Sequence, residues 1–128
     1  MLVDDDEHTN FLNKAIIRHA QFAEEVIAQM TAEEALNYIK RHQATGDLPD
    51  LIFLDINMPL MDGWDFMEQY SRLLLNGSAP KVIMLTSSIN PKDEKRAAQI
   101  DGIAGFRSKP LSRDVLNEIY DEYFAEAV

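Results

Sequence analysis

Five short apolar runs, separated by segments of helical periodicity, are the feature that most limits the folds open to this chain. The runs lie at residues Met1–Val3, Val26–Met30, Leu51–Leu54, Lys81–Leu85 and Ile103–Phe106. Each run has the length of a strand, and the regular alternation of strands with helices is typical of βα units around a mostly parallel sheet. We therefore predict an α/β domain with a doubly wound sheet.

The segments between these runs have the periodicity and the end signals of helices. Phe11, Ile16 and Ile17 share one face of the first predicted helix. Thr31 begins the sequence TAEE, a capping box that opens the second helix. This helix should end near Gly46, because glycine commonly follows the last helical turn.

The later helices are marked by their first residues. We expect the third to begin about Asp62, the fourth near Pro91 and the fifth after a cap at Ser112. Residues 76–80 (NGSAP) form the exit loop of the third helix, and Gly102 stops the fourth. Apolar residues at helical spacing are Trp64, Phe66, Met67 and Tyr70 in the third helix and Val115, Leu116, Ile119, Tyr120 and Phe124 in the fifth, where most should pack on the sheet.

Length and charge limit the classes of function. A chain of 128 residues makes one domain with a real core, so we assign residues 1–128 to a single domain without an output domain. A net charge of −10 disfavours nucleic acid and anionic membranes as partners. The chain has no cysteine, no signal peptide and no apolar run long enough to span a membrane, so we expect a soluble cytoplasmic protein.

Polar residues follow the predicted strands at the edge where ligands bind in doubly wound sheets. Three aspartates follow the first strand, one follows the third, hydroxyl side chains follow the fourth and a lysine follows the fifth. In chain order these residues are Asp4, Asp5, Asp6, Asp55, Thr86, Ser87, Ser88 and Lys109. Acid, hydroxyl and amine groups should therefore meet at one edge of the sheet.

Each of these residues also has a purely structural interpretation. An aspartate after a strand is commonly a loop residue or a helix cap, the sequence DDDE is typical of a solvated helix start, and Lys109 could be an exposed lysine beside a turn. Asp55, however, ends a fully apolar strand next to the strand that ends in Asp4 and Asp5. Because neighbouring carboxylates repel one another, they favour a hard cation such as Mg²⁺, and Lys109 offers a second positive charge. Pro110 fixes the direction of that lysine, through either a cis or a trans peptide bond.

Together these residues resemble the receiver domain of two-component response regulators, of the single-domain chemotaxis type. The motifs that carry the resemblance are LVDDDE, LDINMPLMDG, MLTSS and GFRSKP, and they extend over essentially the whole chain. The resemblance implies a flavodoxin-like sheet of five parallel strands in the order 2-1-3-4-5.

The resemblance also implies roles for the residues at the strand ends. Asp55 would accept a phosphoryl group from a phosphohistidine on a histidine kinase or a histidine phosphotransfer protein. Asp5, Asp55 and the backbone carbonyl of Asn57 would bind Mg²⁺ directly, while Asp4 would act mainly through a metal-bound water. Lys109, Thr86 and Ser87 would contact the phosphoryl oxygens. These residue types suit phosphoryl transfer, which depends mainly on positioning and on charge neutralisation.

Phe106 is an aromatic residue in a strand, and such residues usually belong to the core. Its spacing before Lys109 nevertheless matches the switch residue of the family. On that resemblance, Thr86 moves toward the phosphoryl group and Phe106 turns into the space it leaves, which changes the surface of the fourth helix, fifth strand and fifth helix for an unknown downstream protein. Basic residues on this surface form either one cluster or scattered charges: Lys92, Lys95, Arg96, Arg107 and Arg113.

Other functions and some departures from the family remain to be weighed. An Mg²⁺-dependent phosphatase of the haloacid dehalogenase type would need a second aspartate two positions after Asp55, where Asn57 stands. A receiver that acts only as a scaffold, without phosphorylation, would keep the same landmarks. We expect a signalling domain that assists its own phosphorylation and dephosphorylation rather than an enzyme. The first strand is unusually short, and His8, His19 and His42 should face solvent.

Overall fold

The central strands are the most deeply buried segments of the chain. A computed structural model describes residues 1–73 and 79–125, and all five residues of β3 are buried in it. The elements are β1 (Leu2–Val3), α1 (Glu7–His19), β2 (Ala28–Gln29), α2 (Ala32–Gln43), β3 (Leu51–Asp55), α3 (Gly63–Ser71), β4 (Lys81–Thr86), α4 (Pro91–Ala98), β5 (Ile103–Ser108) and α5 (Arg113–Tyr123). All neighbouring strands are parallel, in the order β2-β1-β3-β4-β5, so the predicted fold and strand order are confirmed.

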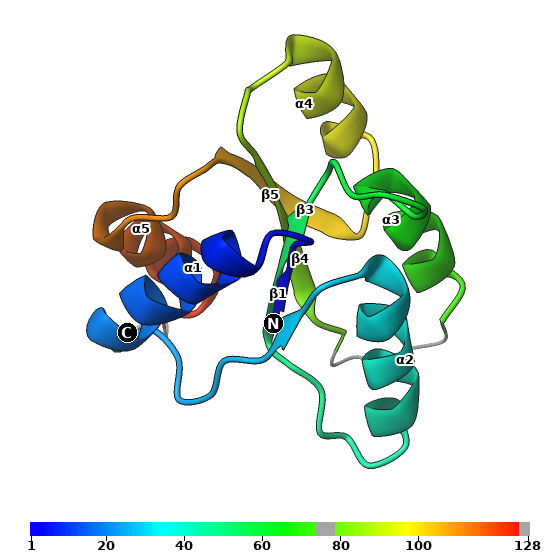
Figure 1. Cartoon of the computed structure of the whole chain (residues 1–128), viewed down its shortest axis with the longest axis horizontal. Helices are drawn as coiled ribbons and strands as arrows, with labels where there is room; N and C mark the ends of the chain where they lie inside the picture. Colours follow the sequence, from blue (N-terminus) through cyan, green and yellow to red (C-terminus); the bar gives the residue numbers. More distant parts are fainter. Residues whose placement is uncertain (74–78, 126–128) are drawn as a thin grey trace.

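Helices cover both faces of the sheet, with α1 and α5 on one side and α2 and α3 on the other (Figure 1). Side chains alternate along β3 between these layers, because successive residues of a strand point to opposite faces. Leu51 and Phe53 pack with the core beneath α1 and α5, whereas Ile52 and Leu54 pack with the core beneath α2, α3 and α4. β3 is therefore buried on both faces, which explains its continuous apolar sequence.

The helix starts were largely predictable, but the details of two caps differ from expectation. Thr31 accepts a hydrogen bond from the Glu34 N–H, whereas the Glu34 carboxylate accepts from the Met30 N–H instead of completing the box at Thr31. A full capping box is present at α3, where the Asp62 and Asp65 side chains each accept from the other's backbone N–H. Ser112 caps α5 as predicted.

Three details of the helices were predicted wrongly. Phe11 is 69% exposed, because the buried face of α1 runs through Asn10, Asn13 and Ile17. Tyr120 is 48% exposed, but most of the apolar residues of α5 are buried or half-buried, as predicted. α4 ends at Ala98, with its last N–H groups bonded three residues back, so Gly102 lies in the following turn rather than at the helix end. His42 was expected to face solvent, but it is half-buried and stacks on Tyr38, with the ring centroids 3.9 Å apart. Residues 76–78 of the loop predicted to follow the third helix lie outside the described residues.

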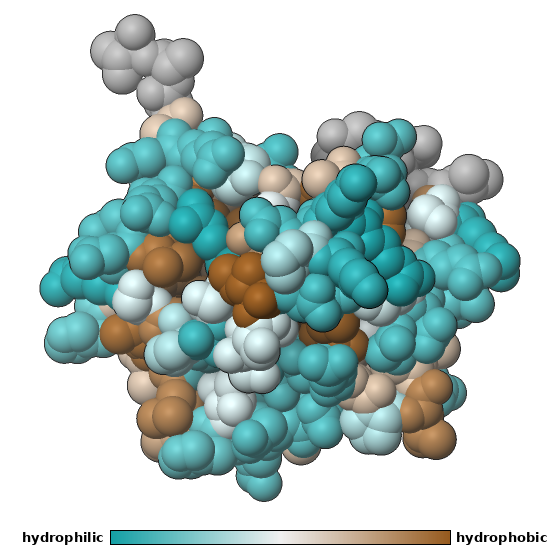
Figure 2. Space-filling model, turned by 90° about the horizontal axis from the view of Figure 1, so that it is seen from above, coloured by the Kyte–Doolittle hydropathy of each residue, from teal (hydrophilic) through white to brown (hydrophobic). Residues whose placement is uncertain are grey.

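The strands at the β1 side of the sheet are short. β1 has only two residues, as its sequence indicated, and β2 keeps only two of the five predicted residues because it pairs with β1 alone. Along residues 1–73 and 79–125, no helix is long and apolar enough to cross a membrane. On the face seen in Figure 2, hydrophilic residues predominate and hydrophobic residues occur in small separate groups.

Candidate functional site

The carboxyl ends of β1 and β3 bring two aspartates together. The parallel register pairs Val3 with Leu54, so the next residues, Asp4 and Asp55, lie side by side at the edge of the sheet. Asp4 is only 4% exposed and Asp55 only 6% exposed. Burial of two neighbouring carboxylates is unfavourable without a compensating positive charge. A cation at the strand ends would therefore be stabilising.

Lys109 supplies one positive charge at this place. Its Nζ lies 2.6 Å from Asp4 Oδ2 and 3.1 Å from Asp55 Oδ1. The lysine is held in place by its backbone N–H, which donates to the Thr86 carbonyl at 2.7 Å, and the following peptide bond to Pro110 is cis. The peptide bond thus has one of the two forms expected from the sequence, and a role of Pro110 in directing the lysine side chain stays a prediction.

The electrostatics of this group follow from burial and from charge pairing. Burial and the charge of Asp4 raise the pKa of Asp55, against hydrogen bonds from Lys109 and from the Asn57 backbone. Burial alone would lower the pKa of Lys109, but its hydrogen bonds to Asp4 and Asp55 and their charges raise it overall. Lys109 therefore stays charged, while the ionised form of Asp55 is held at a cost that a further cation would relieve.

Asp5 completes an oxygen-rich cluster on the open side of the site. One carboxylate oxygen from each of Asp4, Asp5 and Asp55 lies within 4.8 Å of the other two, and Asp5 is exposed. Hard divalent cations such as Mg²⁺ prefer carboxylate oxygens and keep several waters, which the exposed side of this cluster would admit. The donor set therefore fits Mg²⁺. Asn57 is also exposed, and its backbone N–H bonds the Asp55 carboxylate.

Gly63 lets the start of α3 pack tightly against the end of β3. A Cβ at this position would lie 2.8 Å from the Asp55 carbonyl oxygen and 3.0 Å from Ile56 Cα. Its N–H donates to the Ile56 carbonyl at 2.8 Å. Gly63 is thus required for close backbone packing, and the residue of this loop with positive φ is the fully exposed Leu60.

Thr86 and Ser87 lie at the neighbouring end of β4. Thr86 is 2% exposed, and its hydroxyl donates to the Ser88 carbonyl at 2.9 Å and accepts from the Ser88 N–H at 3.2 Å. Ser87 is exposed. The Thr86 side chain therefore belongs to the edge that carries the carboxylates, but its hydroxyl is engaged with the loop that leads to α4.

Phe106 lies one strand further along, paired with Met84. It is half-buried against the core beneath α2, α3 and α4. A small hollow of about 230 Å³ lies beside it, lined by residues of α4 and β5 that include Ala97 and Gly105. The structure thus places this residue between core and surface.

The five basic residues differ in their surroundings. Arg107 is paired with Glu118 at 2.7 Å and with Glu122 at 4.0 Å, both on α5. Arg96 lies over the Trp64 ring, with its guanidinium carbon 4.4 Å from the ring centroid. Two of the five side chains are thus engaged with other elements, and the choice between one basic cluster and scattered charges stays open.

Sequence reasoning missed how the turn between β1 and α1 is held. The Asn10 amide donates to the Asp4 carbonyl at 2.8 Å, and the Asp6 N–H donates to Asp4 Oδ1 at 2.9 Å. Asp6 also caps α1 by accepting from the N–H groups of His8 and Thr9. The helix-start interpretation of the acidic run is thus right for Asp6. Asn10 could have been found only from the helix phase, since it lies seven residues before the buried Ile17 on the same face.

Known proteins are similar to this chain in sequence. A sequence family described as the response regulator receiver domain matches residues 1–121. The hybrid signal transduction histidine kinase L of Dictyostelium discoideum is 33% identical over 126 residues, which cover 96% of this chain but only 7% of that protein. The probable methanogenesis regulatory protein FilR2 of Methanothrix harundinacea is 26% identical, with 95% of this chain and 78% of that protein covered.

Solved structures agree with the sequence relatives. The crystal structure of a two-component response regulator from Cytophaga hutchinsonii superposes with a TM-score of 0.87 and 34% sequence identity, covering 94% of this chain and 92% of that one. The bacteriophytochrome response regulator AtBRR superposes with a TM-score of 0.79 and 26% identity, covering 99% of this chain and 93% of that one.

Proposed function

The chain belongs to the response regulator receiver domain family, and from this membership we propose that it accepts a phosphoryl group on Asp55 from a phosphohistidine of a histidine kinase or a histidine phosphotransfer protein. The observation that carries the proposal is the position of the Asp55 carboxylate, at the end of β3, 3.1 Å from Lys109 Nζ and beside Asp4 and Asp5. A nucleophilic carboxylate flanked by a fixed ammonium and by metal-binding oxygens suits transfer of a highly charged group.

The proposed reaction joins an Asp55 carboxylate oxygen to phosphorus while the phosphorus–nitrogen bond of the donor histidine breaks, and the electron pair of that bond leaves with the imidazole. Asp4, Asp5, Asp55 and the Asn57 carbonyl would hold Mg²⁺. When bound, the metal would neutralise negative charge on the phosphoryl oxygens. Lys109 would supply a second positive charge, and the backbone N–H of Ser87 would donate to the same group.

The proposed output is a change in the surface of α4, β5 and α5. The Thr86 hydroxyl now bonds to Ser88, and it would exchange these bonds for one to a phosphoryl oxygen. Phe106 would then turn inward from its half-buried position toward the space that Thr86 leaves. Phosphorylation would stabilise the state that makes the extra contacts, so a downstream protein that prefers this surface would bind more tightly.

We propose a signalling role for this domain rather than catalysis on a separate substrate. Residues 1–128 would act as one receiver unit that promotes the gain and loss of its own phosphoryl group. The partners would be a phosphohistidine protein and a downstream protein, with no part for nucleic acid. The net charge of −10 supports this choice, because it opposes contact with a polyanion.

Intact-mass measurement after incubation with phosphoramidate and Mg²⁺ tests the proposal. We expect the mass to rise by one phosphoryl group only when Mg²⁺ is present, and we expect Asp55→Asn to abolish the increase. Asp50→Asn is a matched control, since this exposed carboxylate precedes the same strand at its other end. Amide exchange over residues 89–107, with and without beryllofluoride, reports the surface change, which Thr86→Ala should reduce.

Two outcomes would contradict the proposal. Labelling that persists in Asp55→Asn would place the acceptor elsewhere. Absence of labelling in folded protein with Mg²⁺ would favour the scaffold alternative. Unchanged amide exchange alongside normal labelling would remove only the surface change and leave a phosphoryl carrier.

A further inference from the structure

The turn between β1 and α1 carries Asp5, the exposed member of the carboxylate cluster. Asp4 and Asp55 are buried, so packing limits the directions that their side chains can take. Asp5 is exposed, and the direction of its side chain therefore depends mainly on the backbone that carries it. The geometry of the cluster is thus sensitive to the contacts that hold this turn.

Hydrogen bonds hold the backbone on both sides of Asp5. The Asp4 N–H donates to the Gln29 carbonyl at 3.1 Å, and the Asp6 N–H donates to Asp4 Oδ1 at 2.9 Å. Between these two bonds, Asn10 Nδ2 donates to the Asp4 carbonyl oxygen at 2.8 Å. This carbonyl belongs to the same planar peptide group as the Asp5 N–H. Asn10 therefore fixes the plane from which the Asp5 side chain departs.

The side chain of Asn10 is buried in a way that opposes folding. The residue is 5% exposed, and its Oδ1 is buried without a hydrogen-bond partner among the residues that the structure describes. A buried polar atom without a partner lowers stability, and an apolar side chain of similar size would avoid that cost. Apart from a long contact of 3.5 Å to Met30 Sδ, the amide nitrogen bonds only to Asp4 within the described ranges. The bond to Asp4 thus accounts for an amide at this position.

We propose that Asn10 is a positioning residue for the metal site: it holds the peptide group between Asp4 and Asp5 so that the Asp5 carboxylate faces Asp4 and Asp55. The proposal rests on the proposed function, because it concerns the Mg²⁺ that phosphoryl transfer to Asp55 would need. Without this bond the peptide group can turn, and Asp5 spends less time with its oxygen within 4.8 Å of the other two. Loss of a group that orients a metal ligand typically weakens metal binding by about 10- to 100-fold.

A purely structural role makes a different prediction. If Asn10 only helped α1 to pack, its loss would lower the free energy of unfolding and leave the Mg²⁺ affinity of the folded protein unchanged. Asn10→Leu removes both the bond to Asp4 and the unpartnered Oδ1 while it keeps a similar side-chain size. We expect little change in stability, because these two losses have opposite effects, but a clear loss of Mg²⁺ affinity.

Titration of Mg²⁺ into ¹⁵N-labelled full chain measures this affinity, and urea denaturation in EDTA measures stability. We expect the Kd for Mg²⁺ to rise about tenfold in Asn10→Leu, with a urea midpoint near that of the parent. Asn10→Ala removes the same bond without adding bulk, so it should raise the Kd even if leucine does not fit. Asn13→Leu is the matched control, because Asn13 is 4% exposed on the same buried face of α1, three residues further from the turn. It should leave the Kd unchanged.

Backbone motion gives a second readout that needs no metal. The ¹⁵N heteronuclear NOE of the Asp5 amide should fall in metal-free Asn10→Leu and Asn10→Ala and keep the parent value in Asn13→Leu. An unchanged NOE in both Asn10 variants, or a Kd equal to that of the parent, would overturn the proposal and leave the proposed function intact. An equal rise of the Kd in Asn13→Leu would reduce Asn10 to a packing role. Absence of Mg²⁺ binding in the parent would instead overturn both this proposal and the metal site of the proposed function.

Discussion

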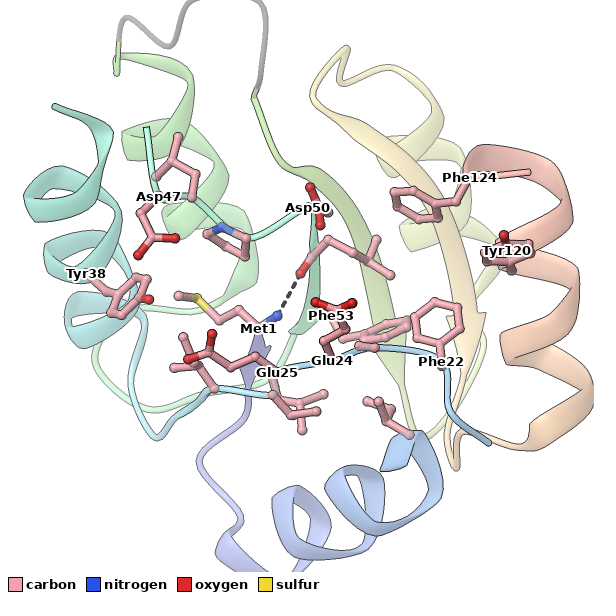
Figure 3. Close-up of a pocket in the computed structure, with 18 residues that line it drawn as sticks. Met1, Phe22, Glu24, Glu25, Tyr38, Asp47, Asp50, Phe53, Tyr120 and Phe124 are labelled. Atoms are coloured by element: carbon pink, nitrogen blue, oxygen red, sulfur yellow. Dashed lines mark hydrogen bonds between the residues drawn. The ribbon is translucent and has the colours of Figure 1, made fainter. Parts of the chain in front are cut away.

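At the carboxyl edge of the sheet, Asp4 and Asp55 lie beneath the surface with Lys109 between them, whereas at the amino edge Asp47 and Asp50 are exposed and line a hollow around Met1 (Figure 3). The same element, β3, connects the two environments. Phe53 forms part of the floor of the hollow, and two residues later Asp55 reaches the buried ion pair. The two edges therefore differ in where charge is placed.

The difference shows which edge of the sheet lowers the stability of the fold. Burying two carboxylates with one ammonium leaves excess negative charge in a poorly solvated place, and this is unfavourable unless another cation arrives. At the amino edge the carboxylates stay hydrated and cost little, and the floor residue Phe53 is only 3% exposed. The unmet interaction is therefore the electrostatic one at the carboxyl edge.

Removing the ammonium from the carboxyl edge should produce the largest effect. We expect Lys109→Met to lower the free energy of unfolding by about 3 kcal/mol in EDTA, because it leaves two buried carboxylates without their partner. Lys81→Met is the control at the amino end of β4, where the lysine is exposed and its Nζ lies 5.9 Å from the centroid of the Tyr123 ring. It should change stability by less than about 1 kcal/mol. Urea denaturation measures the free energy of unfolding of both variants. An equal decrease in the two would contradict the proposed difference between the edges.

Removing one negative charge from the carboxyl edge should have a smaller effect of opposite sign. We expect Asp55→Asn to raise the free energy of unfolding in EDTA by about 1 kcal/mol, because burial and Asp4 both disfavour the ionised carboxyl. The amide oxygen can still accept from Lys109. Mg²⁺ should then stabilise the parent but not the variant, by linkage to metal binding.

Asp50→Asn, at the amino end of the same strand, should change stability by less than about 0.5 kcal/mol with or without Mg²⁺. Thermal unfolding with and without Mg²⁺ compares the two variants. Lower stability of Asp55→Asn in EDTA would show that the carboxyl edge is not under electrostatic strain.

The fold and the strand ends could be predicted because their signals are local. β3 and β4 are continuous apolar runs, and each polar residue at the site follows such a run directly. Parallel pairing then places Asp4 beside Asp55 without further information. Prediction was most accurate for β3 and β4, whose continuous apolar sequences set their own positions.

The remaining errors and omissions concern contacts between elements. Asn10 rather than Phe11 is buried because the cap at Asp6 and the packing against β1 set the rotation of α1. Arg107 is paired with Glu118, eleven residues away, only because α5 packs beside β5. Gly63 owes its importance to the backbone of β3, which no local pattern reveals.

The last predicted effect concerns a buried hydroxyl at the amino edge. Tyr70 is 6% exposed, and its hydroxyl donates to the carbonyl of Pro80, the residue before β4, at 2.9 Å. Burial raises its pKa from 10.0 to about 12. We expect Tyr70→Phe to lower the free energy of unfolding by about 1 kcal/mol at pH 8, because the buried carbonyl loses its partner. Tyr120→Phe, at a largely exposed position, should have no measurable effect.

The pH dependence of stability in the Tyr70→Phe and Tyr120→Phe variants distinguishes the hydrogen bond of the Tyr70 hydroxyl from the packing of its ring. Because the folded pKa of Tyr70 lies above its unfolded value, its contribution to stability is complete below pH 10.0 and is lost as the pH rises toward about 12. The difference in stability between parent and Tyr70→Phe should therefore shrink over that range, whereas the difference for Tyr120→Phe stays near zero. Urea midpoints at pH 8 and at about pH 11 measure both. A difference that does not change with pH would mean that this edge, unlike the carboxyl edge, has no buried group whose ionisation opposes folding.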